Sequence, residues 1–340
     1  MVNTNSKDLL NALAIGEKVK HEVNRRFRLV ELDTDGVFAA MLLLAKKKYA
    51  ALSIVNPLTY AEKLRARQQS SQEQKGTVAA LPPPPTKAEL KGLDIVRRDW
   101  CRLAAEVGRA CVDALLSGKP SEQVLDQIHT HLRTVAEQVR QGSLPLPEFV
   151  ITKMLTKNPE DYPDAKLQPH VQVALRFNQA TNLGGASATS SSRRFRAGDT
   201  VEYIICEDGN NRSAVQRAYS PAEMSGEFRL IKQDGDSENH KTQQPVSLKV
   251  DVQYYLAHQI HPVVSRLVAP IEGTSPAHIA DCLGLDPTAY RRTMASAGEE
   301  GLNEVSAWIP VSFEPECGAL RLKLLISYYY HGGKRPVNWK

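Results

Sequence analysis

The stretch ELDTDGVFAAMLLLAKKKYAAL, residues 31–52, carries two opposite kinds of charge within one short segment. It holds three carboxylates at alternate positions and then three lysines in a row: Glu31, Asp33, Asp35, Lys46, Lys47 and Lys48. Alternate acids are typical of the wet face of a half-exposed strand. They are also the ligands with which proteins hold divalent metal ions for phosphoryl transfer. Spacing alone leaves both interpretations open.

The lysine run has the same ambiguity. On a strand, Lys46 and Lys48 would point to one face, and Lys47 and Tyr49 to the other. Lysines bind phosphates as point charges, and an aromatic ring can lie against a sugar or base. A run of lysines can equally be a solvated face. The pattern by itself predicts a basic surface and not yet a ligand.

The flanking segments predict a mixed helix-and-strand layer. Residues 6–27 have apolar side chains at helical spacing, with Ser6 as an N-cap. From Arg28 to Asp35 the period changes to two, which indicates a strand with Leu32 and Thr34 on one face. KKKYAALSIV, residues 46–55, reads as a second strand.

Residues 56–88 change character, because they are rich in Gln and Ser and end in Pro82 to Pro85. We expect a solvated insertion there. Two helices are then expected as an antiparallel pair, one from Trp100 to Leu116 capped by Asp99, the other from Ser121 to Gln141.

The later part of the chain alternates predicted elements with polar stretches. GDTVEYIICEDG, residues 198–209, reads as a strand, and SPAHIADCLGL, residues 275–285, as a short helix. Between them a helical region is broken or restarted at Pro262. Polar insertions are expected near 182–192 and 232–246.

Composition limits the class of protein. The chain has 340 residues, 42% hydrophobic and 24% charged, with a net charge of +5. This fits a globular protein of two or three domains whose mild basicity permits nucleic-acid binding without demanding it. The longest apolar run, Val37 to Leu44, is too short for a bilayer, and the start carries no secretion signal, so we expect a soluble intracellular protein. Five separated cysteines without a Cys-x-x-Cys pair predict free thiols.

Two further groups of residues were weighed as sites. In DIVRRDW, residues 94–100, Arg97 and Arg98 could pair with phosphate, or Asp99 could hold one of them in a salt bridge at a helix start. Four histidines have spacings that suggest metal ligands: His129, His131, His258 and His261. No cysteine or carboxylate set completes a site with them in the sequence. Phosphate-loop, dinucleotide-turn and nucleophile-elbow motifs are absent.

Several strings in fixed order together resemble one family. They include residues 31–52 and ELKGLDIVRRDWCRLA at 89–104, followed by LTKNPEDYPDAKLQPHVQVALR at 155–176. The chain resembles the family B DNA polymerases, and among them the alpha-type replicative enzymes of eukaryotes. The resemblance implies an α+β fold, in which part of the polymerase palm, a helix with antiparallel strands, precedes a mainly helical thumb with a small β element.

The implied divisions follow the resemblance along the chain. Residues 1–55 would be the end of the palm, 56–88 the insertion, and 89–99 the palm–thumb junction. Residues 100–290 would be the thumb, and 291–340 an atypical tail in place of the family's cysteine-rich modules. The residues that the resemblance assigns to DNA contact are Lys46, Lys47, Lys48, Tyr49, Arg97, Arg98, Lys157, Tyr162, His170 and Arg176.

The resemblance also implies an activity: DNA-directed transfer of deoxynucleotides to a primer end, with Mg²⁺ as cofactor and primer–template or RNA-primed DNA as substrate. The implied partners are primase and a B subunit, the implied compartment is the nucleus, and no membrane is involved. The family's metal-binding aspartates would lie before Met1, so Asp33 and Asp35 are at best auxiliary. We therefore expect a fragment that grips DNA without a bound metal or independent synthesis. The alternative is a non-catalytic DNA-binding or structural fragment that keeps only the thumb fold.

Overall fold

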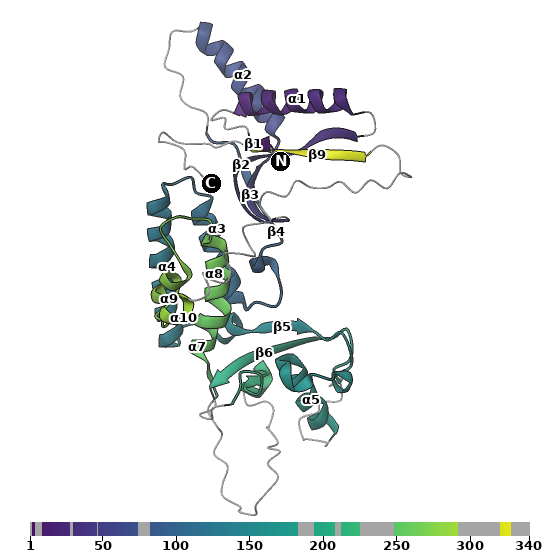
Figure 1. Ribbon diagram of the computed structural model, residues 1–340, viewed down its shortest axis with the longest axis vertical. Helices are drawn as coiled ribbons and strands as arrows, with labels where there is room; N and C mark the ends of the chain where they lie inside the picture. The colour runs from purple at the N-terminus through teal and green to yellow at the C-terminus, as the bar shows by residue number, and fades with distance from the viewer. Residues whose placement is uncertain are drawn as a thin grey trace, which may run out of the picture.

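A computed structural model describes nine segments of the chain: residues 2–3, 9–27, 30–45, 47–73, 82–182, 194–207, 212–224, 248–291 and 320–327. They form three parts along the longest axis (Figure 1). A five-stranded sheet lies at one end, a helical body lies in the middle, and a smaller unit of strands and helix, the distal unit, lies at the other end. The α+β class predicted from the sequence is confirmed.

The five-stranded sheet has the order β1-β9-β2-β3-β4. Its strands are β1 Val2–Asn3, β9 Leu320–Ser327, β2 Val30–Ala45, β3 Lys48–Ile54 and β4 Thr86–Lys91. β2 and β3 pair antiparallel, as expected, and β4, which the sequence did not predict, pairs antiparallel with β3. β9, from the tail, pairs parallel with both β1 and β2, which sequence patterns did not indicate.

The apolar run that follows Asp35 stays in β2, because Val37, Phe38 and Ala39 are buried in succession and so on both faces of the first half of the run, whereas Leu43 near its end is exposed. Val37 and Ala39 pack against the helices α1 Leu9–Arg26 and α2 Pro57–Glu73. Leu42 belongs to the core of the helical body instead. A strand that is buried on both faces shows a continuous apolar run rather than an alternating one.

The range 56–88 contains more regular structure than its composition indicated. α2 occupies its first half, and Tyr60, Ala61 and Leu64 pack against the sheet core at helical spacing. The proline segment is also held: the Tyr60 hydroxyl donates to Pro82 O at 2.6 Å, and Val55 N donates to Pro85 O at 2.9 Å. Composition misjudged the helix because its few apolar residues are enough once a sheet lies beneath them. Residues 74–81 lie outside the described residues.

The helical body begins with α3 Arg102–Leu115 and α4 Ser121–Gln141. The second predicted helix is confirmed to the residue, and Gly142 ends it with a φ of 67°. The cap predicted for the first is wrong. Cys101, not Asp99, is the N-cap, since its Sγ accepts from Ala104 N at 3.4 Å.

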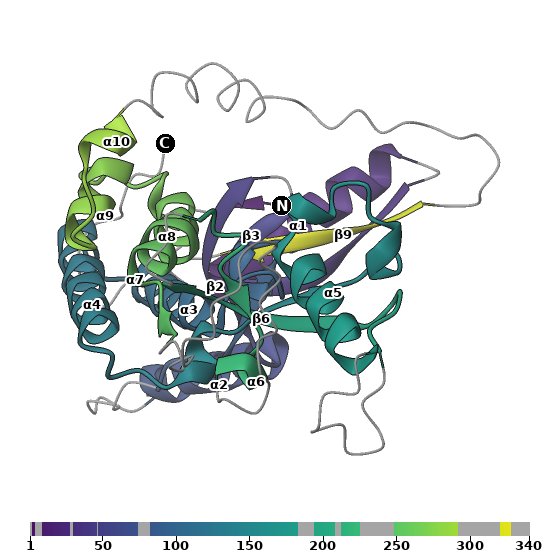
Figure 2. The ribbon, with the colours of Figure 1, turned by 90° about the horizontal axis from the view of Figure 1, so that it is seen from below.

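The rest of the helical body comes from the C-terminal third of the chain. α7 Val252–Tyr254 leads into a π-helix at Tyr255–Ile260, and α8 His261–Val268 then restarts the helix with Pro262 in its first turn. α9 Pro276–Cys282 and α10 Thr288–Arg291 follow. Figure 2 shows α4 and α9 on the side of the molecule away from α5.

The distal unit is built around β6 Thr200–Glu207, which pairs antiparallel with three short strands. These are β5 Ile151–Met154, β7 Ala218–Tyr219 and β8 Lys249–Val250. Two helices, α5 Pro169–Asn182 and α6 Pro221–Met224, join the strands. Three single turns of 3-10 helix, Leu146–Phe149, Pro159–Asp161 and Ala165–Leu167, connect them.

Tyr255 ties the distal unit to the helical body. Its hydroxyl donates to Phe149 O at 2.6 Å and accepts from Ile205 N at 3.2 Å, and its side chain is fully buried. One continuous core therefore runs from Leu42 of β2 through α3 and α4 to β6.

Some expectations fall outside what is described. The polar insertions near 182–192 and 232–246 and most of the tail belong to undescribed ranges. The four cysteines in the described residues are free and buried, as predicted: Cys101, Cys111, Cys206 and Cys282. Among the described helices, none is both long and apolar enough to cross a membrane.

Candidate nucleic-acid interface

The alternating acids lie on the exposed face of β2. Leu32 and Thr34 are half-buried, and the three acids between and around them are exposed, as the period of two predicted. Asp33 accepts from Thr34 N at 2.8 Å and lies 3.6 Å from Lys20 Nζ of α1. Its side chain keeps 70% of its exposure, so this ion pair contributes little to stability.

The turn between β2 and β3 presents the lysines. Lys47 is exposed with a φ of 64°, and Lys48 is exposed at the start of β3. The expectation that Lys47 shares a strand face with Tyr49 is wrong, because Lys47 belongs to the turn and not to a strand. Lys46 lies outside the described residues. We call Lys47 and Lys48 the basic turn.

Gly92 fixes the position of the basic turn. It follows β4 with a φ of 65°, and a Cβ built on it would lie 2.3 Å from the carbonyl oxygen of Lys47. Only glycine allows two backbones to approach this closely in this conformation. Because Tyr49 is opposite Lys91 in the sheet, the basic turn lies where the chain leaves the sheet for the helical body.

Tyr49 points into the sheet surface and not away from it. Its hydroxyl donates to Glu89 Oε1 of β4 at 2.9 Å, and the ring is half-buried. Burial, followed by this hydrogen bond, raises the pKa of the Tyr49 phenol. Lys91, which sequence reasoning did not single out, pairs with the same Glu89 at 3.1 Å and adds a cation beside the turn. Lys91 would have been found if the pairing of Tyr49 with Lys91 across the two strands had been recognised.

The junction segment holds its arginines on the surface. Arg97 and Arg98 are both exposed, and Arg97 pairs with Asp99, which is the salt-bridge alternative weighed from the sequence. Asp94 forms an ion pair with Arg266 of α8, whose guanidinium lies 5.4 Å from the centre of the Trp100 ring. The segment is thus anchored to the helical body on one side while Arg98 remains exposed.

In the distal unit, Tyr162 acts as a local support. Its hydroxyl accepts from Thr156 N at 2.7 Å and from Lys157 N at 3.2 Å. Lys157 is exposed on the loop that these bonds hold. Lys153, on β5, is exposed as well, and was missed because a single lysine in a short strand gives no pattern.

His170 is beneath the surface. It keeps only 1% of its exposure, its ring packs edge-on against Tyr162, and its Nδ1 finds no hydrogen-bond partner among the described residues. Burial, and then the charge of Lys153, lowers the pKa of His170 to about 4. A direct contact with a ligand is therefore not expected of His170, which instead packs beneath Tyr162.

Arg176 is also engaged inside the distal unit. Its guanidinium donates to Ala218 O, lies over the Tyr219 ring and pairs with Glu223 at 3.3 Å. Glu223 in turn accepts from Ser220 N at 2.6 Å, and Ser220 accepts from Glu223 N, which is a capping box for α6. The sequence-predicted contact residues thus separate into exposed cations and internal supports.

The four histidines do not converge on one site. His131 is half-buried with an Nε2 that has no partner among the described residues, and His258 is exposed beside the Tyr254 ring. His261 Nε2 lies 2.8 Å from Pro276 O. Within the described part of the chain, His129 is the one of the four that belongs to a group of candidate ligands, and its neighbours there are residues that the sequence did not connect with it.

Comparisons with known proteins identify the family of the chain. A family model described as DNA polymerase family B matches residues 1–271. The chain belongs to DNA polymerase family B.

Relatives within the family include DNA polymerase alpha catalytic subunits. The chain is 41% identical over 304 residues to the DNA polymerase alpha catalytic subunit of Drosophila melanogaster, covering 89% of this chain and 17% of that protein. It is 42% identical over 291 residues to that of Mus musculus, covering 86% and 16%. The chain thus spans about a sixth of the length of these relatives. A solved family B DNA polymerase of the archaeon Pyrobaculum calidifontis is similar at 22% identity and a TM-score of 0.42, over 69% of this chain and 22% of that chain.

Family B polymerases use divalent metal ions, for which carboxylates are the usual ligands. Glu31, Asp33 and Asp35 do not gather into a group that could hold an ion; among the described residues, three ligand-type side chains meet only at His129, His278 and Cys282. Strand spacing explains this, since alternate residues on one strand stand about 7 Å apart.

Proposed function

We propose that this chain supplies the duplex-gripping part of an alpha-type, DNA-directed DNA polymerase. The observation that carries the proposal is the basic turn, which lies where the chain leaves the sheet for the helical body. Its backbone is held by the close approach of Gly92 to Lys47. Two exposed lysines on a fixed backbone can contact successive phosphates without first being ordered. The family membership and the relatives named DNA polymerase alpha catalytic subunit support the choice of ligand.

The contacts are of two kinds. Lys47, Lys48 and Arg98 act as exposed cations where the sheet meets the helical body, and Lys46 is proposed to join them. Lys153 and Lys157 form a second basic point on the distal unit, at the other end of the long axis. We infer that the five-stranded sheet is palm, that the helical body with the distal unit is thumb, and that a bound duplex contacts both basic points.

The remaining assignments concern the complete enzyme. There the reaction joins a deoxynucleoside triphosphate to a primer 3′ hydroxyl, with Mg²⁺ as the divalent ion. We propose that the enzyme works in the nucleus with primase and a B subunit on RNA-primed DNA. Because Glu31, Asp33 and Asp35 are not gathered as metal ligands, we expect the 340-residue chain to bind duplex and not to extend it.

A salt titration tests the contribution of the lysines to duplex binding. The change is K46A/K47A/K48A in the full chain, and the measurement is fluorescence anisotropy with a labelled primer–template duplex at several KCl concentrations. Each lost phosphate contact removes about 0.9 from the slope of log affinity against log salt, so the slope falls by up to about 2.7.

A matched control removes the same charge elsewhere. K18A/K63A/R65A takes three exposed cations from α1 and α2, and its slope should stay that of the wild type. An unchanged slope in the lysine variant overturns the assignment of the basic turn. Primer extension by the isolated chain contradicts the expected lack of synthesis. If neither extension nor duplex binding is found, a structural fragment that retains only the thumb fold is the better description.

A further inference from the structure

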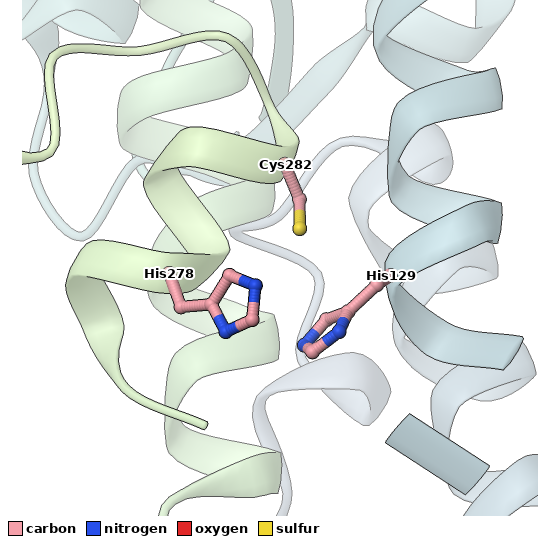
Figure 3. A group of neighbouring side chains, drawn as sticks. All are labelled: His129, His278 and Cys282. Atoms are coloured by element: carbon pink, nitrogen blue, oxygen red, sulfur yellow. The ribbon is translucent and has the colours of Figure 1, made fainter. Parts of the chain in front are cut away.

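Three side chains with metal-binding atoms meet between α4 and α9. His129 comes from α4, while His278 and Cys282 stand four residues apart on α9 and so share one face of that helix. One donor atom from each residue lies within 4.8 Å of the other two (Figure 3). The two imidazole rings have centroids 4.2 Å apart.

This donor set suits a zinc-class ion. Zn²⁺ binds imidazole nitrogen and thiolate sulfur in tetrahedral sites, in which neighbouring donors lie about 3.3–3.8 Å apart, given bonds of about 2.0–2.3 Å. The observed spread exceeds this by about 1 Å, which side-chain torsions can close without backbone movement. Harder ions such as Mg²⁺ prefer oxygen donors and do not match a set of two nitrogens and a sulfur.

The surroundings both order the group and give access to it. Cys282 and His129 are buried, whereas His278 is half-buried at the edge of an open pocket that Ser121 and Gly273 help to line. The Thr274 hydroxyl lies 3.2 Å from His129 Nε2, and this contact holds the ring in its orientation in the metal-free protein.

Charged groups also surround the cluster. Three carboxylates line the same pocket: Glu122, Asp126 and Glu272. Arg133, a cation near His129 and Cys282, disfavours a bound cation, whereas the carboxylates favour one. The acids leave the field at the pocket favourable to a cation, and they offer oxygen for a fourth ligand.

We propose that His129, His278 and Cys282 form a binding site for one zinc-class divalent cation. The fourth position is open to water or to a carboxylate of the pocket. On binding, the Cys282 thiol loses its proton to solvent as the sulfur–metal bond forms, and both imidazoles bind in their neutral form. The ion would join α9 to α4 across a large sequence separation, and so stabilise the C-terminal end of the helical body.

Cobalt provides the direct test, because a thiolate bound to Co²⁺ gives a charge-transfer absorption that free thiols lack. The full 340-residue chain, freed of metal, is titrated with Co²⁺ and then with Zn²⁺ as competitor. We expect the band to saturate at one equivalent, Zn²⁺ to abolish it, and one proton to be released per ion. The melting temperature should rise with added Zn²⁺.

Variants separate this site from the other cysteines and histidines. C282S should lose the band, and H278Q, at a half-exposed position where folding is least at risk, should weaken Co²⁺ binding at least about tenfold. C111S and H131A remove a buried thiol and a half-buried imidazole elsewhere, and should bind as the wild type does. Retention of the band in C282S, or wild-type affinity in H278Q, overturns the proposal. Duplex binding is independent of this site, and its result does not bear on the metal.

Discussion

The basic turn of the sheet and the residues of the distal unit to which DNA contact was assigned differ in how far their side chains are engaged inside the protein. The sequence assigned DNA contact to both, Lys46–Tyr49 in one and Lys157, Tyr162, His170 and Arg176 in the other. In the sheet, Lys47 and Lys48 are exposed on a backbone that Gly92 holds. In the distal unit, Tyr162 and Arg176 already have partners inside the protein, and His170 is buried.

The difference shows that a recognised motif mixes exposed side chains, which are able to contact a ligand, with side chains that hold their neighbours in place. What separates the two groups is whether the polar atoms of a side chain are already engaged within the fold. The predictions below test this separation by asking which changes alter stability and which alter binding.

The largest expected effect belongs to Arg176. Replacing it by Met should lower the free energy of unfolding by about 2–4 kcal/mol, since Glu223, with a side chain only 7% exposed, loses its cation. Urea denaturation measures this loss. At concentrations where the variant is folded, the salt slope for duplex binding should stay that of the wild type.

Arg98 serves as the comparison for Arg176, because its side chain is exposed rather than paired inside the protein. R98M should change the free energy of unfolding by less than about 0.5 kcal/mol, and should reduce the salt slope by up to about 0.9. If R176M reduces the slope and R98M does not, the division between internal support and exposed contact is wrong.

His170 gives a pH-dependent effect of similar size. The folded protein keeps the imidazole neutral with a pKa of about 4, against 6.5 for the ordinary group, so between these values the unfolded chain binds more protons. The free energy of unfolding therefore falls as the pH drops from 6.5 to 4, by up to about 3 kcal/mol from this residue. H170Q should flatten the stability profile across this window.

Denaturation midpoints at a series of pH values measure the profile. H258Q, at an exposed position, serves as the control and should keep the wild-type slope. A wild-type slope in H170Q would mean that His170 is not held neutral in the fold.

Gly92 should show a smaller cost in stability and a clear one in binding. G92A combines the strain of a φ of 65° with a Cβ that meets the Lys47 carbonyl, for a loss of about 2–3 kcal/mol. G142A has nearly the same φ, 67°, and nothing within 4 Å of its Cβ, so its loss should be about 1–2 kcal/mol. Only G92A should weaken duplex binding. Equal duplex affinities of G92A and G142A would mean that Gly92 does not hold the basic turn in its binding conformation.

The smallest effect is expected from Y162F. The hydroxyl accepts from two backbone donors on an exposed loop, and water can replace it there. Thermal melting should report a loss of about 1 kcal/mol or less, with at most a few-fold weaker duplex binding. A loss of stability as large as that of R176M would make Tyr162 part of the core.

The sequence indicated much of the local structure. α4 matches its predicted bounds because its apolar stripe is complete and Gly142 ends it. The alternation of Leu32 and Thr34 with the acids could also be predicted, because the backbone geometry of a strand sets this local period of two. α2 was not readable, because a weakly apolar segment gains its structure only from the sheet it meets. β9, LRLKLLIS, alternates as a strand does, but its parallel pairing with β2 joins segments that lie far apart in the sequence.

By itself, the sequence determined the family, the mixed helix-and-strand class and the presence of exposed lysines after an apolar strand. Tertiary structure decided which polar groups remain exposed: it brought Gly92 against Lys47, buried His170 under Tyr162 and joined His129 with His278 and Cys282. The physical reason is sequence separation. Periodicity acts over a few residues, whereas each of these contacts joins elements that only the folded core brings together.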